Sequence, residues 1–188
     1  NLDWSTERTL WQDAVQKAPG RARPAYNLAK HHHRKIGALD QAVQLYERSF
    51  FLQAPLPKYS KSLSLNGIAG IYYLKKDYHK VIEFCRKALE IYPGFQNARY
   101  NIMIAYLGLK AWEEASGQLD FLIEKFPADW FYSYMKGVVL IRLGEPKKAL
   151  PYFQDALKRK HDELRVIVHI GKALSLMGHP DRAEWFFY

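Results

Sequence analysis

Residues 97–127 read NARYNIMIAYLGLKAWEEASGQLDFLIEKFP, and this stretch decides the fold. It holds two amphipathic helical patterns, which are separated by a short turn at residues 108–112, and it ends at a proline. Features of the stretch recur every 34 residues along the chain, as in Val81, Ala115, Ala149 and Ala183. A fixed period of this size, built from helix–turn–helix units, is typical of a helical repeat array. The sequence therefore predicts an all-α fold.

The same period predicts a single repeat domain over residues 1–188. A partial repeat at 1–20 precedes full repeats at about 22–55, 62–95, 96–129 and 130–163, and a truncated repeat occupies 164–188. The interval from Ala42 to Val81 is 39 residues, so the proline-containing connection around Pro55 carries five extra residues. The truncated repeat ends in residues 185–187, Trp-Phe-Phe, with no following repeat to cover them. We expect this end to be frayed or to mediate self-association.

The sequence shows no membrane span, no signal peptide and no possible internal disulfide. No apolar run approaches the roughly 18 residues that a membrane span needs, and the first residues lack a signal-peptide pattern. The chain does not begin with Met and ends inside a helical pattern, so we expect it to be a piece of a larger protein. The only cysteine, Cys85, excludes an internal disulfide and lies on a predicted buried stripe. The compartment stays open, because a domain without disulfides fits either side of a membrane.

The net charge of +9 comes from 28 Lys and Arg residues against 19 Asp and Glu residues. Such an excess suggests an acidic peptide, an anionic lipid surface or a nucleic acid as partner, or only a solvated cationic surface. The cations are spread along the chain, and many lie near predicted helix C-termini, where they complement the helix dipole. This distribution disfavours a nucleic acid partner.

Motifs for catalysis are missing from the sequence. It contains no HExxH, no GxSxG, no glycine-rich phosphate loop and no Cys/His pair at a meaningful spacing. The run His31-His32-His33 is no metal site, because adjacent side chains on a helix point about 100° apart. We therefore expect no catalytic residue, no metal and no cofactor.

A recurring pattern consists of a small residue midway along a first helix, an aromatic residue, a turn glycine, an alanine in a second helix and a closing proline. It is present as Ala29, Gly37 and Ala42, as Ala69, Tyr72, Val81, Ala88 and Pro93, as Tyr106, Ala115 and Pro127, as Gly137, Gly144, Ala149 and Ala156, and as Gly171, Gly178 and Ala183. Two positions depart from it, since Val81 replaces the alanine and His161 replaces one closing proline. With this pattern nearly the whole chain resembles tetratricopeptide repeat (TPR) proteins. The resemblance implies a right-handed α-solenoid of about five stacked antiparallel helix pairs, incomplete at both ends. It also implies a non-enzymatic scaffold for protein or peptide partners.

In the family that the chain resembles, the first helix of each repeat lines a concave groove. Its solvent-side positions are here Arg23, Tyr26, Asn27, Lys30, Arg34, Asn66, Tyr73, Asn97, Tyr100, Asn101, Phe131, Tyr134 and Arg142, with Arg165, Val168, His169 and Lys172 in the last repeat. We call this set the predicted groove. It is basic at the N-terminal end and aromatic further along, which suits a peptide, including an acidic one.

Two asparagines of this set have a more specific expectation. Asn27 and Asn101 stand where similar repeats, such as those of O-GlcNAc transferase, hold the main chain of a peptide with an asparagine ladder. The alternative for each is a hydrogen bond on the helix surface or between repeats. The positions between and after them hold Gly67, Met135 and His169, so the ladder is incomplete.

A second, narrower resemblance lies near the N-terminus. Residues 4–19, WSTERTLWQDAVQKAP, together with Arg23 and residues 27–29, are similar to the start of a soluble repeat tail in certain bacterial membrane proteins. These are polytopic proteins related to lipid-linked glycosyltransferases. The resemblance implies an alternative function, a regulatory or substrate-presenting tail that a preceding region tethers to a membrane.

Overall fold

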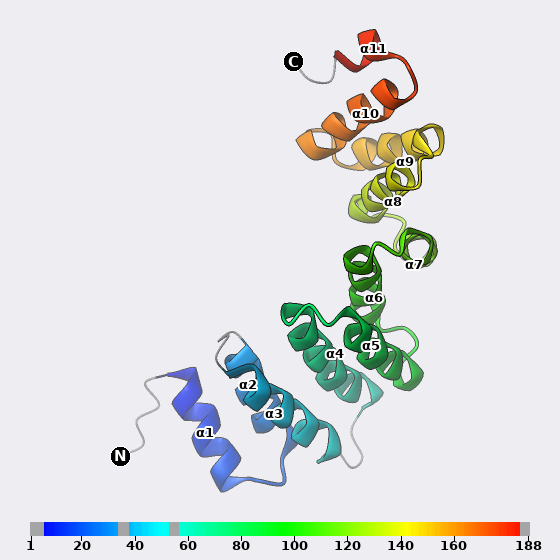
Figure 1. Ribbon diagram of the computed structural model, residues 1–188. Coiled ribbons are helices and arrows are strands. Elements are labelled where there is room, and N and C mark those ends of the chain that lie inside the picture. Colours follow the sequence, from blue (N-terminus) through cyan, green and yellow to red (C-terminus); the bar gives the residue numbers. More distant parts are fainter. Residues whose placement is uncertain (1–5, 34–37, 53–56, 185–188) are drawn as a thin grey trace. The chain divides into compact units, whose positions relative to one another are not determined.

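The computed structural model describes residues 6–33, 38–52 and 57–184. Within these ranges it contains helices and turns and no strand (Figure 1). The helices are α1 (Glu7–Lys17), α2 (Ala22–His33), α3 (Leu39–Phe51), α4 (Lys58–Leu74), α5 (Tyr78–Ile91), α6 (Gln96–Leu109), α7 (Trp112–Lys125), α8 (Trp130–Arg142), α9 (Pro146–Arg159), α10 (Leu164–Leu176) and α11 (Pro180–Glu184). The predicted all-α fold of stacked helix pairs is confirmed. Arg34, Pro55 and the aromatic end at 185–187 lie outside the described residues.

The helices form two compact units, Asn1–Ala105 and Tyr106–Tyr188, and the boundary falls inside α6. In the first unit, contacts join α1 to α2, α2 to α3, α3 to α4 and α4 to α5. In the second, they join α7 to α8, α8 to α9, α9 to α10 and α10 to α11. We call α2, α4, α6, α8 and α10 the first helices of their repeats, and α3, α5, α7 and α9 the second helices. Two successive pairs of first helices also touch, α2 with α4 and α8 with α10.

The turn inside a helix pair has the same hydrogen bonds in four successive repeats. At 34-residue intervals, a backbone N–H donates to the carbonyl five residues earlier at 2.8–3.0 Å, from Asp77, Ala111, Glu145 and His179. The residue before each of these has a left-handed backbone with φ between 58° and 82°, and these residues are Lys76, Lys110, Gly144 and Gly178. This is the Schellman ending of a helix. The sequence period is therefore also a period of backbone conformation.

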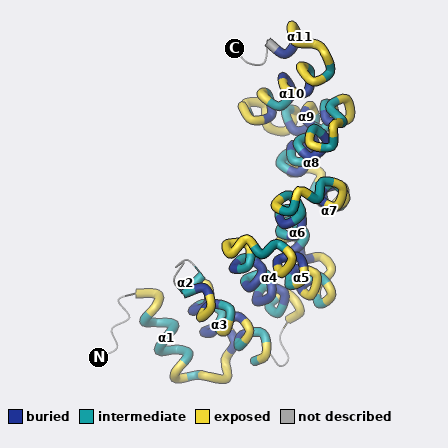
Figure 2. The backbone as a smooth tube through the Cα atoms, viewed as in Figure 1, coloured by how far each residue is buried: buried dark blue, intermediate teal, exposed yellow. Residues whose placement is uncertain are grey.

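Small residues lie where the helices cross most closely. The predicted crossing positions are at most 2% exposed in every case, namely Ala42, Val81, Ala115, Ala149 and Ala183. On α8, a Cβ atom at Gly137 would lie 2.5 Å from the Phe153 ring of α9. Helices α2 to α10 thus carry a buried stripe of small and apolar residues and an exposed stripe on the other side, whereas α1 has no fully buried residue (Figure 2). The exposed stripes of the first helices are the surface on which the predicted groove was placed.

Candidate functional site

The N-terminal end of the predicted groove lies on α2. Arg23 and Lys30 are exposed there, whereas Tyr26 and Asn27 are half-buried. The Tyr26 ring meets the Tyr46 ring edge-on at 5.5 Å, and burial raises the pKa of the Tyr26 hydroxyl. Asn27 and Lys30 line a cavity of about 110 Å³ with residues of α1. This end therefore offers two exposed cations beside a small polar hollow.

The centre of the predicted groove in the first unit is a pair of amides. Nδ2 of Asn101 on α6 donates a hydrogen bond to Oδ1 of Asn66 on α4 at 2.8 Å, and both side chains are half-buried. Because an amide group has two donors and one acceptor oxygen, the two N–H groups of Asn66 and the oxygen of Asn101 keep hydrogen-bonding capacity. Tyr100 is half-buried, while Asn97 and Tyr73 are exposed. The amide pair joins the first helices of successive repeats.

In the second unit, the predicted residues separate into two places. Phe131 and Tyr134 lie together on α8, with ring centroids 6.3 Å apart, and Tyr134 is buried at 7% exposure in the local core. Burial raises the pKa of the Tyr134 hydroxyl. Arg142 is exposed near the other end of α8, where its guanidinium lies 6.0 Å from the centroid of the Trp112 ring on α7. The structure therefore brings Phe131 and Tyr134 together and leaves Arg142 apart from them.

Helix α10 adds a cation and an imidazole to this aromatic surface. The Arg165 guanidinium lies 5.5 Å from the Trp130 ring centroid and 6.0 Å from that of Tyr134. A hydrogen bond to Glu163 at 2.5 Å raises the pKa of Arg165. Nδ1 of His169 lies 2.8 Å from the Arg165 carbonyl oxygen, which can only accept, so Nδ1 is the donor. The result is a mixed aromatic and cationic surface across α8 and α10.

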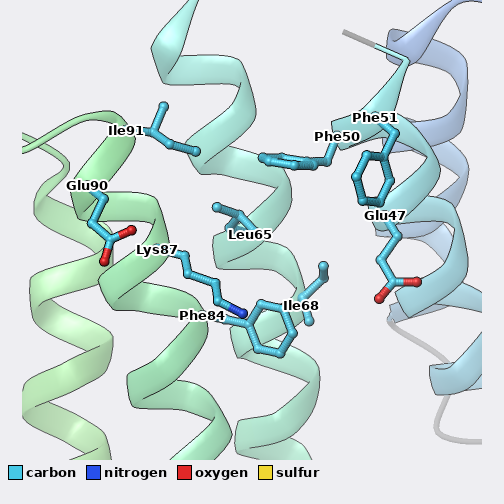
Figure 3. A pocket seen from close by; sticks show the side chains of 9 residues that line it. All are labelled: Glu47, Phe50, Phe51, Leu65, Ile68, Phe84, Lys87, Glu90 and Ile91. Carbon is cyan, nitrogen blue, oxygen red and sulfur yellow. The ribbon is translucent and has the colours of Figure 1, made fainter.

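The structure also contains an apolar cavity that the sequence did not predict. This cavity of about 430 Å³ lies between α3 and α5, with α4 at its base (Figure 3). Its lining residues are Glu47, Phe50, Phe51, Leu65, Ile68, Phe84, Lys87, Glu90 and Ile91. We call it the α3–α5 pocket. A sequence signal for this pocket was the pair of adjacent aromatic residues Phe50 and Phe51 at the end of α3. Because adjacent side chains on a helix point in different directions, one helix face cannot bury both rings.

The remaining candidates for chemistry are the Cys85 thiol and the possible metal ligands. Cys85 is fully buried, and this burial raises the pKa of its thiol to about 12, which confirms the predicted core thiol. Across the described ranges, no three His, Cys, Asp or Glu side chains are grouped so that they could hold a metal. Among the described helices, none combines the length and apolarity needed to cross a membrane.

The sequence matches two family models, both described as tetratricopeptide repeat. One covers residues 63–95 and the other residues 100–163, which together are just over half of the chain. No curated protein sequence matches the chain significantly.

Solved structures with the same fold include repeat proteins of low sequence identity. YrrB, a TPR protein described as having an unusual peptide-binding site, is 18% identical with a TM-score of 0.73, over 94% of this chain and 88% of its own. MamA from Desulfovibrio magneticus RS-1 is 16% identical with a TM-score of 0.73, over 96% and 91%. A further MamA structure is 20% identical with a TM-score of 0.70, over 96% and 88%. These similarities show the fold.

Proposed function

The chain belongs to the tetratricopeptide repeat proteins, and we propose that it is a protein-interaction scaffold that binds a polypeptide segment along its first helices. The observation that carries the proposal is that the amides of Asn66 and Asn101, on successive first helices, are only half-buried and keep unused donors and an unused acceptor beside the bond that joins them. The similarity to YrrB, which is described as having a peptide-binding site, supports a peptide as ligand.

The amide pair suits the main chain of a peptide. The bond between the two side chains uses one donor of Asn101 and one acceptor site of Asn66, so the pair keeps free N–H groups on Asn66 and a free oxygen on Asn101. A peptide group needs one donor and one acceptor, and it exposes both whatever its side chain is. Asn66 and Asn101 would therefore hold the backbone, and neighbouring side chains would set the sequence preference.

Aromatic and cationic side chains supply that preference. Tyr73 on α4 is exposed and Tyr100 on α6 is half-buried, so each lies on the same helix as one of the amides. Aromatic rings bury a large area with little loss of conformational entropy. Arg23 and Lys30 are exposed on α2 and favour acidic side chains in the ligand. Since exposed charges are screened by salt, this part of the affinity should fall as ionic strength rises.

The test uses a library of random peptides displayed on phage and selected on the immobilised full chain. We expect the selected peptides to lose most of their binding to an Asn66→Ala/Asn101→Ala variant. A matched control is Gln44→Ala/Gln154→Ala, which removes two exposed amides from second helices and should leave binding unchanged. Equal binding to both variants, with both folded by circular dichroism, would remove the amide pair from the proposal.

A second candidate function rests on the resemblance of residues 4–19 to the start of a membrane-protein repeat tail. In that case the same groove would regulate, or present substrates to, a membrane-embedded glycosyltransferase-like region of the same protein. Reading the gene upstream of Asn1 tests this proposal. Many membrane spans directly upstream would support it, and an upstream stop codon or a further soluble domain would end it.

A further inference from the structure

The α3–α5 pocket lies on a different side of α4 from the predicted groove. On α4, Leu65 and Ile68 line the pocket, whereas Asn66 and Tyr73 belong to the groove. At 100° per residue, the centres of these two pairs are roughly 120° apart around the helix. Figure 3 shows Leu65 and Ile68 between Phe50 and Phe51 of α3 and Phe84 and Ile91 of α5. A ligand of the groove therefore leaves this pocket open.

The second unit has a pocket at the equivalent place in the repeat. Leu65, Phe84, Lys87 and Ile91 of the first pocket are each two 34-residue periods before Ser133, Tyr152, Asp155 and Arg159 of the second. Phe50 likewise corresponds to Ile123 once the five extra residues before Val81 are counted. The two cavities have nearly the same volume, about 430 and 420 Å³. The repeat architecture thus provides the hollow in both units.

The second pocket satisfies its polar groups internally. Ser133 donates to Asp155 at 2.7 Å, and Asp155 also accepts two hydrogen bonds from Arg159 at 2.8 and 3.0 Å. The hydrogen bond from Arg159 is the largest cause that lowers the pKa of the Asp155 carboxyl. Lys136, which corresponds to Ile68, is buried and bonded to Ser116 and Asp120. A polar lining is therefore compatible with this fold.

In the first unit the equivalent lining is largely apolar, although Lys87 stands at the position of Asp155. Leu65, Ile68 and Ile91 replace Ser133, Lys136 and Arg159. Leu65 and Ile68 are buried at the base of the pocket, whereas Phe51 at the edge is 79% exposed. Packing within the core accounts for the apolar base of the pocket, but it does not account for the exposed Phe51 ring at the edge. A contiguous apolar hollow of this size falls in the range of about 300–1,000 Å³ that is usual for binding sites.

Charges at the edge of the pocket indicate the partner. Lys87 is paired with Glu83 at 2.6 Å, and its Nζ lies 5.1 Å from the Phe84 ring centroid. Within the described part of the chain, Glu47 and Glu90 take part in no ion pair, and they stand on the two opposite walls, α3 and α5. Although the whole chain carries a net charge of +9, this pocket is bordered by two unpaired carboxylates. It therefore complements a ligand with positive charge on both sides of an apolar centre.

The walls also indicate the conformation of the ligand. The three lining elements are α-helices, so the pocket offers mainly side chains and no sheet edge to which an extended peptide could pair. A ligand that enters an apolar hollow must bring its own backbone hydrogen bonds or leave peptide groups unsatisfied. A helix meets this requirement and presents side chains at three- and four-residue spacing.

We propose that the α3–α5 pocket is a second docking site, which takes the apolar stripe of a partner's amphipathic helix whose flanking positions carry Lys or Arg. The proposal does not depend on the predicted groove, since the two surfaces share no lining residue. Ligands at the two places can be bound at once by the same first unit. The chain would then join two partners of different chemistry.

The test selects a phage-displayed library of random segments of about 16 residues, roughly four helical turns, on the immobilised full chain. We expect one family of recovered segments with apolar residues at three- and four-residue spacing and Lys or Arg beside them. These segments should bind a Glu47→Lys/Glu90→Lys variant at least about tenfold more weakly, and should also lose affinity for Phe51→Ser. They should bind Asn66→Ala/Asn101→Ala as the unmodified chain does, which separates this result from the groove test.

Each variant has a matched control at an exposed position elsewhere in the chain. Glu114→Lys/Asp162→Lys makes the same change in net charge at two exposed carboxylates elsewhere, and Leu164→Ser matches Phe51→Ser at another exposed apolar residue. Circular dichroism shows whether each variant is folded. Recovery of no such family, or equal losses in the controls, would overturn the proposal. A dimer in sedimentation that dissociates in Phe51→Ser would also overturn it, because the occupant would then be a second copy of this chain.

Discussion

Asn101 donates to Asn66 at 2.8 Å, and this bond joins two first helices through side chains alone. Its loss should cost little stability, because both half-buried amides remain accessible to water. We expect Asn101→Ala to lower the free energy of unfolding by about 1 kcal/mol, the net value of a typical hydrogen bond. Urea unfolding followed by circular dichroism measures this, with the exposed Asn97→Ala as control. A loss of unfolding free energy several times larger would show that the amide pair mainly stabilises the fold, which would argue against a role in ligand binding.

The approach of α9 to α8 requires a glycine at position 137. An added Cβ would lie 2.5 Å from the ring of Phe153, which is fully buried and cannot move aside without disturbing the core. Gly137→Ala should therefore destabilise the chain by about 1–3 kcal/mol. A Cβ added at Gly117 on α7 would meet no atom within 4 Å, so Gly117→Ala should instead stabilise by about 0.5–1 kcal/mol. Thermal unfolding of both variants tests the contrast, and equal shifts would contradict it.

Two of the four left-handed turn positions carry lysine where the other two carry glycine. Lys76 and Lys110 have φ of 59° and 58°, a conformation that a side chain disfavours. We expect Lys110→Gly to raise the free energy of unfolding by up to about 1 kcal/mol, and Gly144→Lys to lower it by a similar amount. Lys147→Gly, inside the first turn of α9, should destabilise, which shows that glycine is favourable only at the turn. Destabilisation by Lys110→Gly would contradict the turn geometry.

The buried thiol gives a prediction that depends on pH. Burial raises the pKa of Cys85 to about 12, so at pH 8 its thiolate fraction is roughly a thousandfold below that of a free cysteine. A disulfide reagent should therefore modify the folded chain very slowly and the urea-unfolded chain rapidly. Because the raised pKa favours the neutral thiol in the folded state, the stability from this group should fall as pH rises above the thiol's ordinary pKa. Rapid, stoichiometric modification of the folded chain would show that Cys85 is not buried.

The periodic features of this fold were open to prediction because they depend on local sequence. A small residue every 34 positions places the helix crossings, and the buried alanines such as Ala115 and Ala149 confirm those positions. The turns repeat at the same interval. At Lys76 and Lys110, however, the residue type does not predict the left-handed backbone that the structure shows. Local spacing was therefore a sufficient guide to the helix pairs.

Burial across helices was harder to predict. Tyr134 lies at a solvent-side position by helical spacing, yet rings from α8, α9 and α10 surround it and leave it 7% exposed. Lys136 carries a charge and is nevertheless buried, because Ser116 and Asp120 of α7 bind its ammonium group. The α3–α5 pocket combines residues of three helices, so no single stretch of sequence predicts it. These features depend on which helices meet and on the side chains that each brings.

The most direct test of peptide binding at the first helices is nuclear magnetic resonance of the side-chain amides. A peptide selected on the chain is added to ¹⁵N-labelled protein, and the NH₂ signals of Asn66 and Asn101 are followed during the titration. If these amides hold the peptide backbone, their signals should shift together with the backbone signals of α4 and α6 and saturate at one equivalent. Saturable binding that leaves both NH₂ signals in place and shifts only residues of α3 and α5 would contradict the account.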